Sequence, residues 1–411
     1  MKVTGIFIVL LCVAGAGSAA EDPDRLEPYL ETLRERGAPP EDFVIGQLDE
    51  YDLIIFDDAL HTAVSPFDYY RKLVFNPEFQ EKVRFIFLEV VAVNQQPALD
   101  RYLQSEEEDI TLLYPAFQND FSGRGWPYKT YFDLLRSIRE ANSTLPEGKR
   151  FRVIAVNAPV YWKEIEDSRD LELFRLSLAG NDYTMYRIML SYLDYFESGE
   201  KGVFLTNTRH AYKGIKNGEG DYFLNCGTFF HQRDPGRTFS VRFHNITLSL
   251  KRRKEPDPEK PGSTEGLEKL EIEWIRMEEG LWDTAFGAHG NRPVGFRLDN
   301  TPFGRAAYIG NHMLDAAPGQ TIQDAYDGLI FLVPLDKVRR TGMVDLIYTD
   351  SFRKELARRL KILYTEEQME GILREKGYRT VIDYIDNEFS EEPEIPQPLI
   401  REIGSVSEWK E

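Results

Sequence analysis

Short apolar runs that alternate with longer helical patterns are the feature that most constrains the fold of this chain. Mainly apolar runs lie at 51–56, 83–88, 151–157 and 202–205; the first three are each followed by a segment with helical spacing, and the fourth closes the repeat. Short runs of this kind are typical of parallel strands that are buried on both faces. The order therefore predicts an α/β fold, with a mostly parallel central sheet and helices on both faces.

The pattern changes after the fourth run. Further extended segments predict a β-rich middle insertion, at 221–224, 238–250 and 267–277. The segment 251–266 between the last two is charged and rich in Pro and Gly, which predicts an exposed loop. An apolar run at 328–334 predicts one more strand of the sheet, and helical spacing from Asp350 onward predicts a helical C-terminal tail.

The first twenty residues are typical of a secretory signal peptide. Lys2 gives a positive start, 6–13 is apolar, and Ser18, Ala19 and Ala20 form a small-residue cleavage pattern. This apolar stretch is too short for a membrane span, and no later segment is apolar for long enough. We expect a secreted or periplasmic protein with an α/β domain at 21–345 and a helical extension at 346–411.

The acidic composition argues against nucleic acid as a partner. The formal net charge is -19, and cleavage of the signal would remove Lys2 and make it more negative by one. A chain this acidic repels phosphate backbones, and the basic run at 251–254 has acidic neighbours. Cys226 is the one cysteine left after cleavage, so no internal disulfide is expected.

Ionisable residues follow three of the predicted strands. Asp57, Asp58 and His61 follow the first run, Glu89 ends the second, and His210 follows the fourth. Ligands and catalytic groups gather at the carboxyl ends of strands in open α/β sheets. The sequence therefore predicts one site that is assembled from distant segments.

These residues allow two chemistries. In one, His61 is a general base that takes a proton from water, while Glu89, Asp58 and His210 orient groups or stabilise charge. In the other, His61, Glu89 and His210, with or without Asp58, bind a divalent metal that acidifies water. No serine-hydrolase elbow, phosphate-binding glycine loop or zinc-protease helix motif is present.

Three further residues are candidate substrate contacts. Asp57 and Arg209 lie beside the predicted catalytic residues in sequence. Arg297 ends a segment rich in Gly, Pro and Arg, and a guanidinium there would suit an anionic ligand.

The strand-end motifs resemble the erythromycin esterase/ChaN/Tiki superfamily. The matching segments are Asp58-Ala-Leu-His61, Phe87-Leu-Glu89, Asn181-Asp-Tyr-Thr-Met185 and Asn207-Thr-Arg-His210. Members of the superfamily usually have Gly-Glu before the first motif histidine and Arg-Asp at the helix start. Here Asp57 and Asp58 replace Gly and Glu, and Asn181 replaces Arg.

The resemblance implies ester hydrolysis without a metal, metal-dependent peptide cleavage, or haem binding. It also implies a role for Asp182, which matches the helix-start Asp and is expected to bind substrate. We expect an esterase-like hydrolase without a cofactor, acting on a small-molecule or peptide substrate. The alternatives are a metal-dependent peptidase and a protein that binds haem or another ligand without turnover. Tyr69 and Tyr70, close to His61 in sequence, are candidate haem ligands and leave haem binding as an alternative.

Overall fold

A computed structural model describes residues 23–192, 196–255, 267–308 and 316–389, with side chains described outside 248–274. The predicted signal peptide and most of the predicted loop at 251–266 lie outside the described residues. The centre of the fold is a seven-stranded sheet in the order β3-β2-β4-β1-β5-β9-β8. Its strands are β1 (Leu53–Asp57), β2 (Val83–Ala92), β3 (Arg152–Asn157), β4 (Lys201–Thr206), β5 (Thr238–Phe243), β8 (Val294–Arg297) and β9 (Gly328–Phe331).

The sheet is parallel except at one edge. Neighbouring strands from β3 to β9 pair in parallel, and β8 pairs with β9 in the antiparallel direction. All five residues of β1 are buried, as expected for a central strand with covered faces. The predicted α/β class with a mostly parallel sheet is confirmed.

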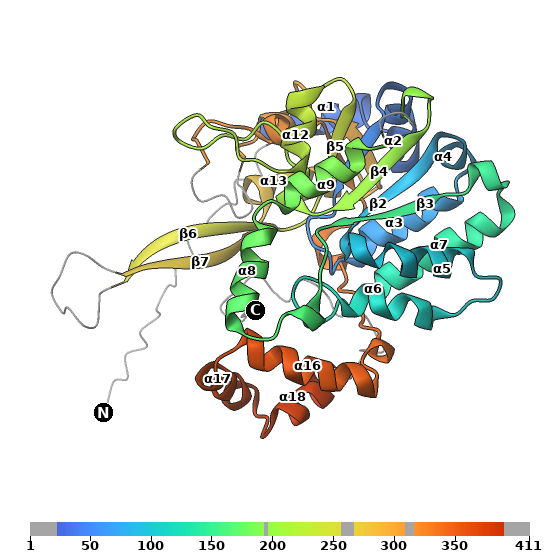
Figure 1. Cartoon of the computed structure of the whole chain (residues 1–411). Helices are drawn as coiled ribbons and strands as arrows, with labels where there is room; N and C mark the ends of the chain where they lie inside the picture. The colour runs from blue at the N-terminus through green and yellow to red at the C-terminus, as the bar shows by residue number, and fades with distance from the viewer. Residues whose placement is uncertain (1–22, 193–195, 256–266, 309–315, 390–411) are drawn as a thin grey trace, which may run out of the picture.

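Helices cover both faces of the sheet (Figure 1). Along β1, Ile54 and Phe56 belong to one hydrophobic cluster, whereas Leu53 and Ile55 belong to the other. This alternation follows from the two-residue period of a strand. The first cluster includes residues of α3 (Val64–Phe75), α5 (Gln96–Gln104) and α7 (Lys129–Thr144); the second includes residues of α1 (Pro23–Glu35), α9 (Asn181–Leu190), α12 (Cys226–Arg233) and α13 (Leu281–Ala288).

The middle insertion contains a two-stranded antiparallel hairpin that projects from the body (Figure 1). Its strands are β6 (Thr247–Glu255) and β7 (Leu267–Ile275). The single strand predicted at 238–250 was wrong, because the chain leaves the sheet after Phe243 and starts a new strand at Thr247. The strand predicted at 221–224 was also wrong: an isolated bridge between Lys216 and Tyr222 lies there.

Two elements were missed in the sequence. The strand β8 lies inside a segment that was interpreted as a loop, and α2 (Pro40–Glu50) follows α1 directly. In the described residues, the other α-helices outside the C-terminal part are α4 (Pro77–Lys82), α6 (Tyr114–Gln118), α8 (Ser168–Leu178), α11 (Thr208–Ala211), α14 (Pro302–Arg305) and α15 (Ile322–Ala325).

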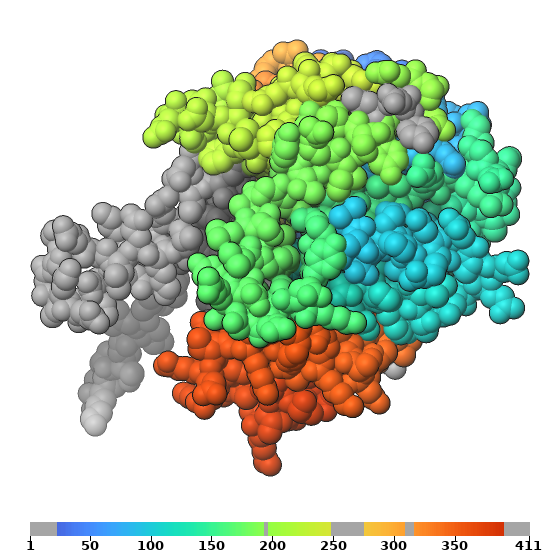
Figure 2. Space-filling model, in the orientation of Figure 1, coloured from blue at the N-terminus to red at the C-terminus, as the bar shows by residue number. Residues whose placement is uncertain are grey.

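The predicted helical tail is confirmed as α16 (Asp350–Leu363), α17 (Glu366–Lys376) and α18 (Val381–Glu388). Thr365 and Gln368 form the expected capping box, and Gly377 ends α17 in a left-handed conformation. These helices lie against the green segment that includes α8 (Figure 2). Their apolar residues belong to the same cluster as one face of the sheet.

Hydrogen bonds from the buried Arg359 connect α16 to the α/β domain. Its guanidinium donates to the backbone carbonyl of Gln118 at 2.7 Å and to the Asn119 side chain at 3.1 Å. It also donates to Glu355 on its own helix at 2.8 Å. None of the helices in the described residues has the length and apolar character needed to cross a membrane.

Candidate active site

The strand order explains why distant residues meet. Strand β4 lies between β1 and β2, so that Asp57 pairs with Thr206 and Leu88 pairs with Leu205. The residues that follow these strands therefore share the carboxyl edge of the sheet. His61, Glu89 and His210 come together there, as predicted from their positions at strand ends.

A tight turn after β1 brings His61 back toward this edge. Ala59 has a φ of 60°, which is unusual for a residue other than glycine. Its N–H donates to the Asp57 carboxylate at 2.8 Å, and this bond supports the turn. His61 is thereby placed three residues after Asp58, with its ring against that carboxylate.

Both ring nitrogens of His61 face polar groups. The distance from Nδ1 is 2.7 Å to Asp58 Oδ2 and 3.0 Å to the Tyr131 hydroxyl. Nε2 lies 2.9 Å from the side-chain nitrogen of Asn207. The ring also stands edge-on to Trp126, with centroids 5.4 Å apart.

The orientation of Asn207 is fixed by its second contact. Asn207 Oδ1 caps the short helix α11 by accepting the backbone N–H of Arg209 at 2.9 Å. Its NH₂ group therefore points to His61 Nε2. An amide nitrogen can only donate, so this arrangement matches an imidazole with its lone pair on Nε2 and its proton on Nδ1, toward Asp58.

Glu89 connects the two histidines. One of its oxygens is 3.2 Å from His210 Nε2, and the other is 3.6 Å from His61 Nε2. The Thr206 hydroxyl donates to this second oxygen, as does the backbone N–H of Asn207 at 3.3 Å. The buried carboxylate is thus well supplied with donors, as a buried charge requires.

His210 lies between two carboxylates. Its Nε2 faces Glu89, and its Nδ1 is 2.7 Å from Asp182 Oδ1. The same Asp182 oxygen accepts the backbone N–H of Cys226 at 2.9 Å. Asp182 is therefore a positioning residue for the imidazole.

Burial and charge shift the pKa values of the four central groups. Burial lowers the pKa of His61, but the Asp58 and Glu89 carboxylates outweigh it and raise the pKa well above its usual value. Burial also lowers the pKa of His210, and Glu89 and Asp182 outweigh this and raise it to about 10. Burial raises the pKa of Glu89, yet the two histidines hold it well below its ordinary value. Burial raises the pKa of Asp58 to about 6, against the lowering effect of His61.

These groups make a site with one mobile proton beside a fixed ion pair. His210 and Glu89 carry opposite charges at neutral pH. The side chains of His61 and His210 are 11% and 14% exposed, so both rings reach the surface at the sheet edge. The arrangement is suited to moving a proton at His61 next to a charge that does not change.

Asp57 does not occupy the place expected of a substrate contact. It is fully buried, and its oxygens accept the Thr208 hydroxyl at 2.8 Å and the Tyr326 hydroxyl at 2.6 Å. The Arg242 guanidinium lies 3.6 Å away. Asp57 therefore holds the end of β1 to its neighbours, which corrects the interpretation of this residue.

The two predicted arginines lie in different places. Arg209 is exposed next to His210, at the carboxyl edge. Arg297 is at the opposite edge, where its guanidinium binds Gln47 at 3.1 Å and the Tyr51 hydroxyl at 3.2 Å. The prediction that Arg297 joins the site is wrong, because β8 runs antiparallel and ends where β9 begins.

Asn181, where the superfamily has Arg, has a structural contact. Its side-chain oxygen accepts the backbone N–H of Ala158 at 2.8 Å, which ties the start of α9 to the segment after β3. Tyr69 and Tyr70, the candidate haem ligands, are buried among core aromatics such as Phe56 and Phe243. Burial and then the nearby Asp58 raise the pKa of Tyr70, so both tyrosines are core residues and Tyr70 packs behind the Asp58 carboxylate.

The donor set does not fit a metal centre. Each ring nitrogen of His61 and His210 already faces a hydrogen-bonding group at 3.2 Å or less. In the part of the chain that the structure describes, no group of three or more His, Cys, Asp or Glu side chains is arranged to hold a metal ion. His61, Glu89 and His210, which were expected as ligands if a metal is bound, meet here as hydrogen-bonding partners.

Sequence reasoning missed Asn207, Thr206 and Tyr131. Thr206 and Asn207 lie at a strand end, so the rule that identified His210 could have included them. Tyr131 comes from the middle of α7, and its position against His61 depends on how that helix packs on α3. No local motif marks such a contact.

Comparisons with known proteins extend the description of the fold. Neither a protein-family model nor a curated protein sequence matches the chain. Among solved structures, a succinoglycan biosynthesis protein is similar, with a TM-score of 0.52 and 9% identity over 79% of this chain and 100% of that one. The fold is therefore shared with a protein of very different sequence.

The similar structures also include two proteins whose names occur in the superfamily that the motifs resemble. One is the erythromycin esterase EreC, in an open conformation, with a TM-score of 0.46 and 13% identity over 74% of this chain and 95% of that one. The other is the haem-binding ChaN of Campylobacter jejuni, with a TM-score of 0.27 and 13% identity over 49% of this chain and 85% of that one.

Proposed function

We propose that this chain is an exported hydrolase that cleaves an ester or amide bond, with His61 as the base that activates water. The observation that supports the proposal most strongly is the Asp58–His61 pair, 2.7 Å apart, with a fixed N–H donor at the other ring nitrogen. A carboxylate at Nδ1 orients the ring and leaves Nε2 as the basic atom.

The water would lie beside His61 and Glu89. Nε2 and the nearer Glu89 oxygen are 3.6 Å apart, which is too short to hold a water between them but allows one water at their side to hydrogen-bond to both. Nε2 takes a proton from the water, and the oxygen attacks the substrate carbonyl to form a tetrahedral intermediate. The protonated His61 then returns the proton to the leaving oxygen or nitrogen as the carbonyl re-forms.

His210 supplies fixed positive charge. With its pKa raised to about 10, it is protonated at neutral pH. Its two N–H groups point to Glu89 and Asp182, so its effect on a developing oxyanion acts through space, within a partly buried site. Asp182 holds the ring, and the exposed Arg209 next to it is the proposed contact for an anionic part of the substrate.

Two other functions would use the same edge. A binding protein without turnover, for haem or another ligand, would use the same residues for contact but would need no base. A metal-dependent peptidase would need the histidines to turn toward a metal. Since Tyr69 and Tyr70 are in the core and the imidazoles are held by hydrogen bonds, we place both behind the metal-independent hydrolase.

A substrate panel tests the proposal. Purified protein is assayed with p-nitrophenyl esters and with chromogenic amides, before and after treatment with EDTA, next to His61→Gln and Glu89→Gln. We expect turnover that survives EDTA and falls by about 10²–10⁴-fold in His61→Gln. An absorption band of bound haem, a stoichiometric metal with EDTA-sensitive activity, or equal turnover in His61→Gln would reject it.

We also propose that residues 1–20 are a signal peptide and that residues 21–345 and 346–411 form the α/β domain and its helical extension. Expression of the whole chain in a host with a secretory pathway, followed by N-terminal sequencing of the exported product, tests the first point. A mature N-terminus at Glu21 is expected, and an intact Met1 in exported protein would contradict it.

A further inference from the structure

A cavity lies at the amino edge of the sheet, the opposite edge from His61. It has a volume of about 270 Å³ and lies at the starts of β1 and β5, where Leu53 and Thr238 line it. The last turns of α9 and α12 contribute Leu190 and Phe230. None of its lining residues is part of the proposed active site.

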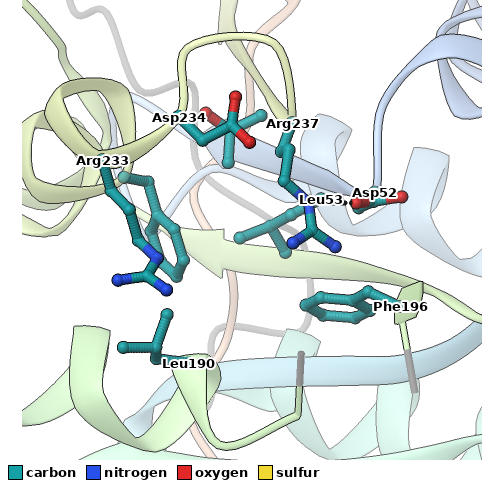
Figure 3. A pocket seen from close by; sticks show the side chains of 9 residues that line it. Asp52, Leu53, Leu190, Phe196, Arg233, Asp234 and Arg237 are labelled. Carbon is teal, nitrogen blue, oxygen red and sulfur yellow. Dashed lines mark hydrogen bonds and ion pairs between the residues drawn. The ribbon is translucent and has the colours of Figure 1, made fainter. Parts of the chain in front are cut away.

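The cavity combines apolar walls with two guanidinium groups. Leu53, Leu190, Phe196 and Phe230 supply the apolar surface. Arg233 and Arg237 extend into the same space from either side of it, above Leu190 and Phe196 (Figure 3). Ligand sites commonly combine apolar surface with a few convergent polar groups.

Arg237 is held in place for binding. Its Nε donates to the Asp52 carboxylate at 2.5 Å, and Asp52 also accepts Lys201 at 2.8 Å. Its backbone carbonyl accepts the N–H groups of Asp52 and Leu53. In the described residues no partner is found for its two terminal nitrogens, so the guanidinium is fixed through one nitrogen with the others free.

Arg233 is an exposed cation with no hydrogen bond or ion pair in the part of the chain that the structure describes. The nearby Asp234 does not offset it directly, since its side chain accepts the backbone N–H of Gly236 at 3.2 Å. The lining side chains carry two positive and two negative charges, and Asp52 is also bound by Lys201, which lies outside the cavity. Arg233 and the terminal nitrogens of Arg237, which have no partner in the described residues, therefore favour an anionic group.

We propose that this cavity binds a small amphipathic anion, a carboxylate or phosphate group joined to an apolar body. The acidic group would lie between Arg233 and Arg237, and the apolar part would cover Leu190 and Phe196. The volume corresponds to roughly nine water-sized groups, which is the size of a small aryl acid. The site is independent of the hydrolase proposed above.

Phenylacetate, with phenylacetamide as its uncharged counterpart, is the probe. Titration calorimetry and saturation-transfer NMR with the whole protein should show saturable binding of phenylacetate and about tenfold weaker binding of phenylacetamide. Arg233→Gln should weaken phenylacetate binding about tenfold. Because the Arg233 side chain has no partner in the described structure, this change should leave the unfolding midpoint unaltered.

The matched control is Arg374→Gln. Arg374, like Arg233, is in the last turn of its helix, α17, but it lines no part of this cavity. The Arg374→Gln variant should bind phenylacetate with the same affinity as the wild type. Absence of saturable binding to the wild type, or equal affinity of Arg233→Gln and wild type, would overturn the proposal.

Discussion

The side-chain amide of Asn207 faces His61 Nε2 at 2.9 Å, and its oxygen is held by the cap of α11. Two influences on His61 therefore oppose each other. The carboxylates of Asp58 and Glu89 favour the protonated ring, whereas the amide N–H favours the lone pair on Nε2. The balance decides the pH at which His61 becomes a base.

Asn207→Asp isolates the amide contribution. An aspartate can still cap α11 through the Arg209 N–H, but it replaces the donor at Nε2 by a carboxylate oxygen. We expect the pKa of His61 to rise by about one unit or more, which moves the onset of activity to higher pH. The pH profile of kcat/KM and ¹⁵N NMR of the imidazole measure both effects.

The control for this variant is Asn217→Asp, which adds the same charge at another backbone-capping asparagine. It should leave the pH profile unchanged. An unaltered His61 titration in Asn207→Asp would show that the amide does not set the state of the ring.

His210 makes stability depend on pH. Its pKa is about 10 in the folded chain and about 6.5 in an unfolded one, so its contribution is fully present below pH 6.5 and is lost as the pH rises toward 10. Between these limits the free energy of unfolding should fall by up to about 1.4 kcal/mol per pH unit on its account. Urea unfolding of wild type and His210→Gln from pH 6 to pH 10 measures the difference.

The difference in the free energy of unfolding between wild type and His210→Gln should become smaller as the pH rises. His289→Gln serves as the control, since burial and nearby arginines lower the pKa of His289 and give no such loss above pH 6.5. Parallel curves for wild type and His210→Gln would mean that His210 is not charged in the folded protein.

Removing the Tyr326 hydroxyl tests the structural role of Asp57. Tyr326→Phe removes the donor 2.6 Å from the buried carboxylate, and we expect a loss of about 1–3 kcal/mol in the free energy of unfolding. Tyr308→Phe is the matched control. The Tyr308 hydroxyl is buried with no partner in the described structure, so its removal should cost almost nothing. Equal losses of unfolding free energy in Tyr326→Phe and Tyr308→Phe would argue against a specific hydrogen bond from Tyr326 to Asp57.

Replacing Arg359 tests whether the C-terminal helices fold together with the α/β domain. Arg359→Met leaves the Gln118 carbonyl and the Asn119 side-chain oxygen without their Arg359 donor, and should cost about 1–3 kcal/mol. Lys354→Met, at an exposed position of the same helix, should change stability by less than about 0.5 kcal/mol. A single cooperative urea transition is expected in both variants. A separate early transition in Arg359→Met would show that the helices unfold independently.

The sequence predicted the sheet and the central residues because both follow from local patterns. The apolar runs identify β1 and β2, and His61 and Glu89 are recognised by their positions after or at the end of these runs. That β4 inserts between β1 and β2 is set by tertiary packing, and the meeting of Glu89 with His210 depends on it.

Other errors have equally specific causes. Asp57 and Asp58 are adjacent in sequence, yet the turn at Ala59 directs Asp58 to His61 and leaves Asp57 buried under Tyr326. Arg297 was assigned to the site because a Gly- and Pro-rich segment resembles a loop. An antiparallel edge strand has few residues and a weak pattern, and its direction cannot be derived from composition.

The most direct test of the proposed mechanism is to compare two pKa values. With a substrate from the panel, the pH dependence of kcat/KM gives the pKa of the catalytic base, and ¹⁵N NMR gives the pKa of His61 in the same protein. The mechanism predicts that the two values coincide and that both rise together in Asn207→Asp. Activity that follows a different ionisation, or persists where His61 is protonated, would contradict His61 as the base.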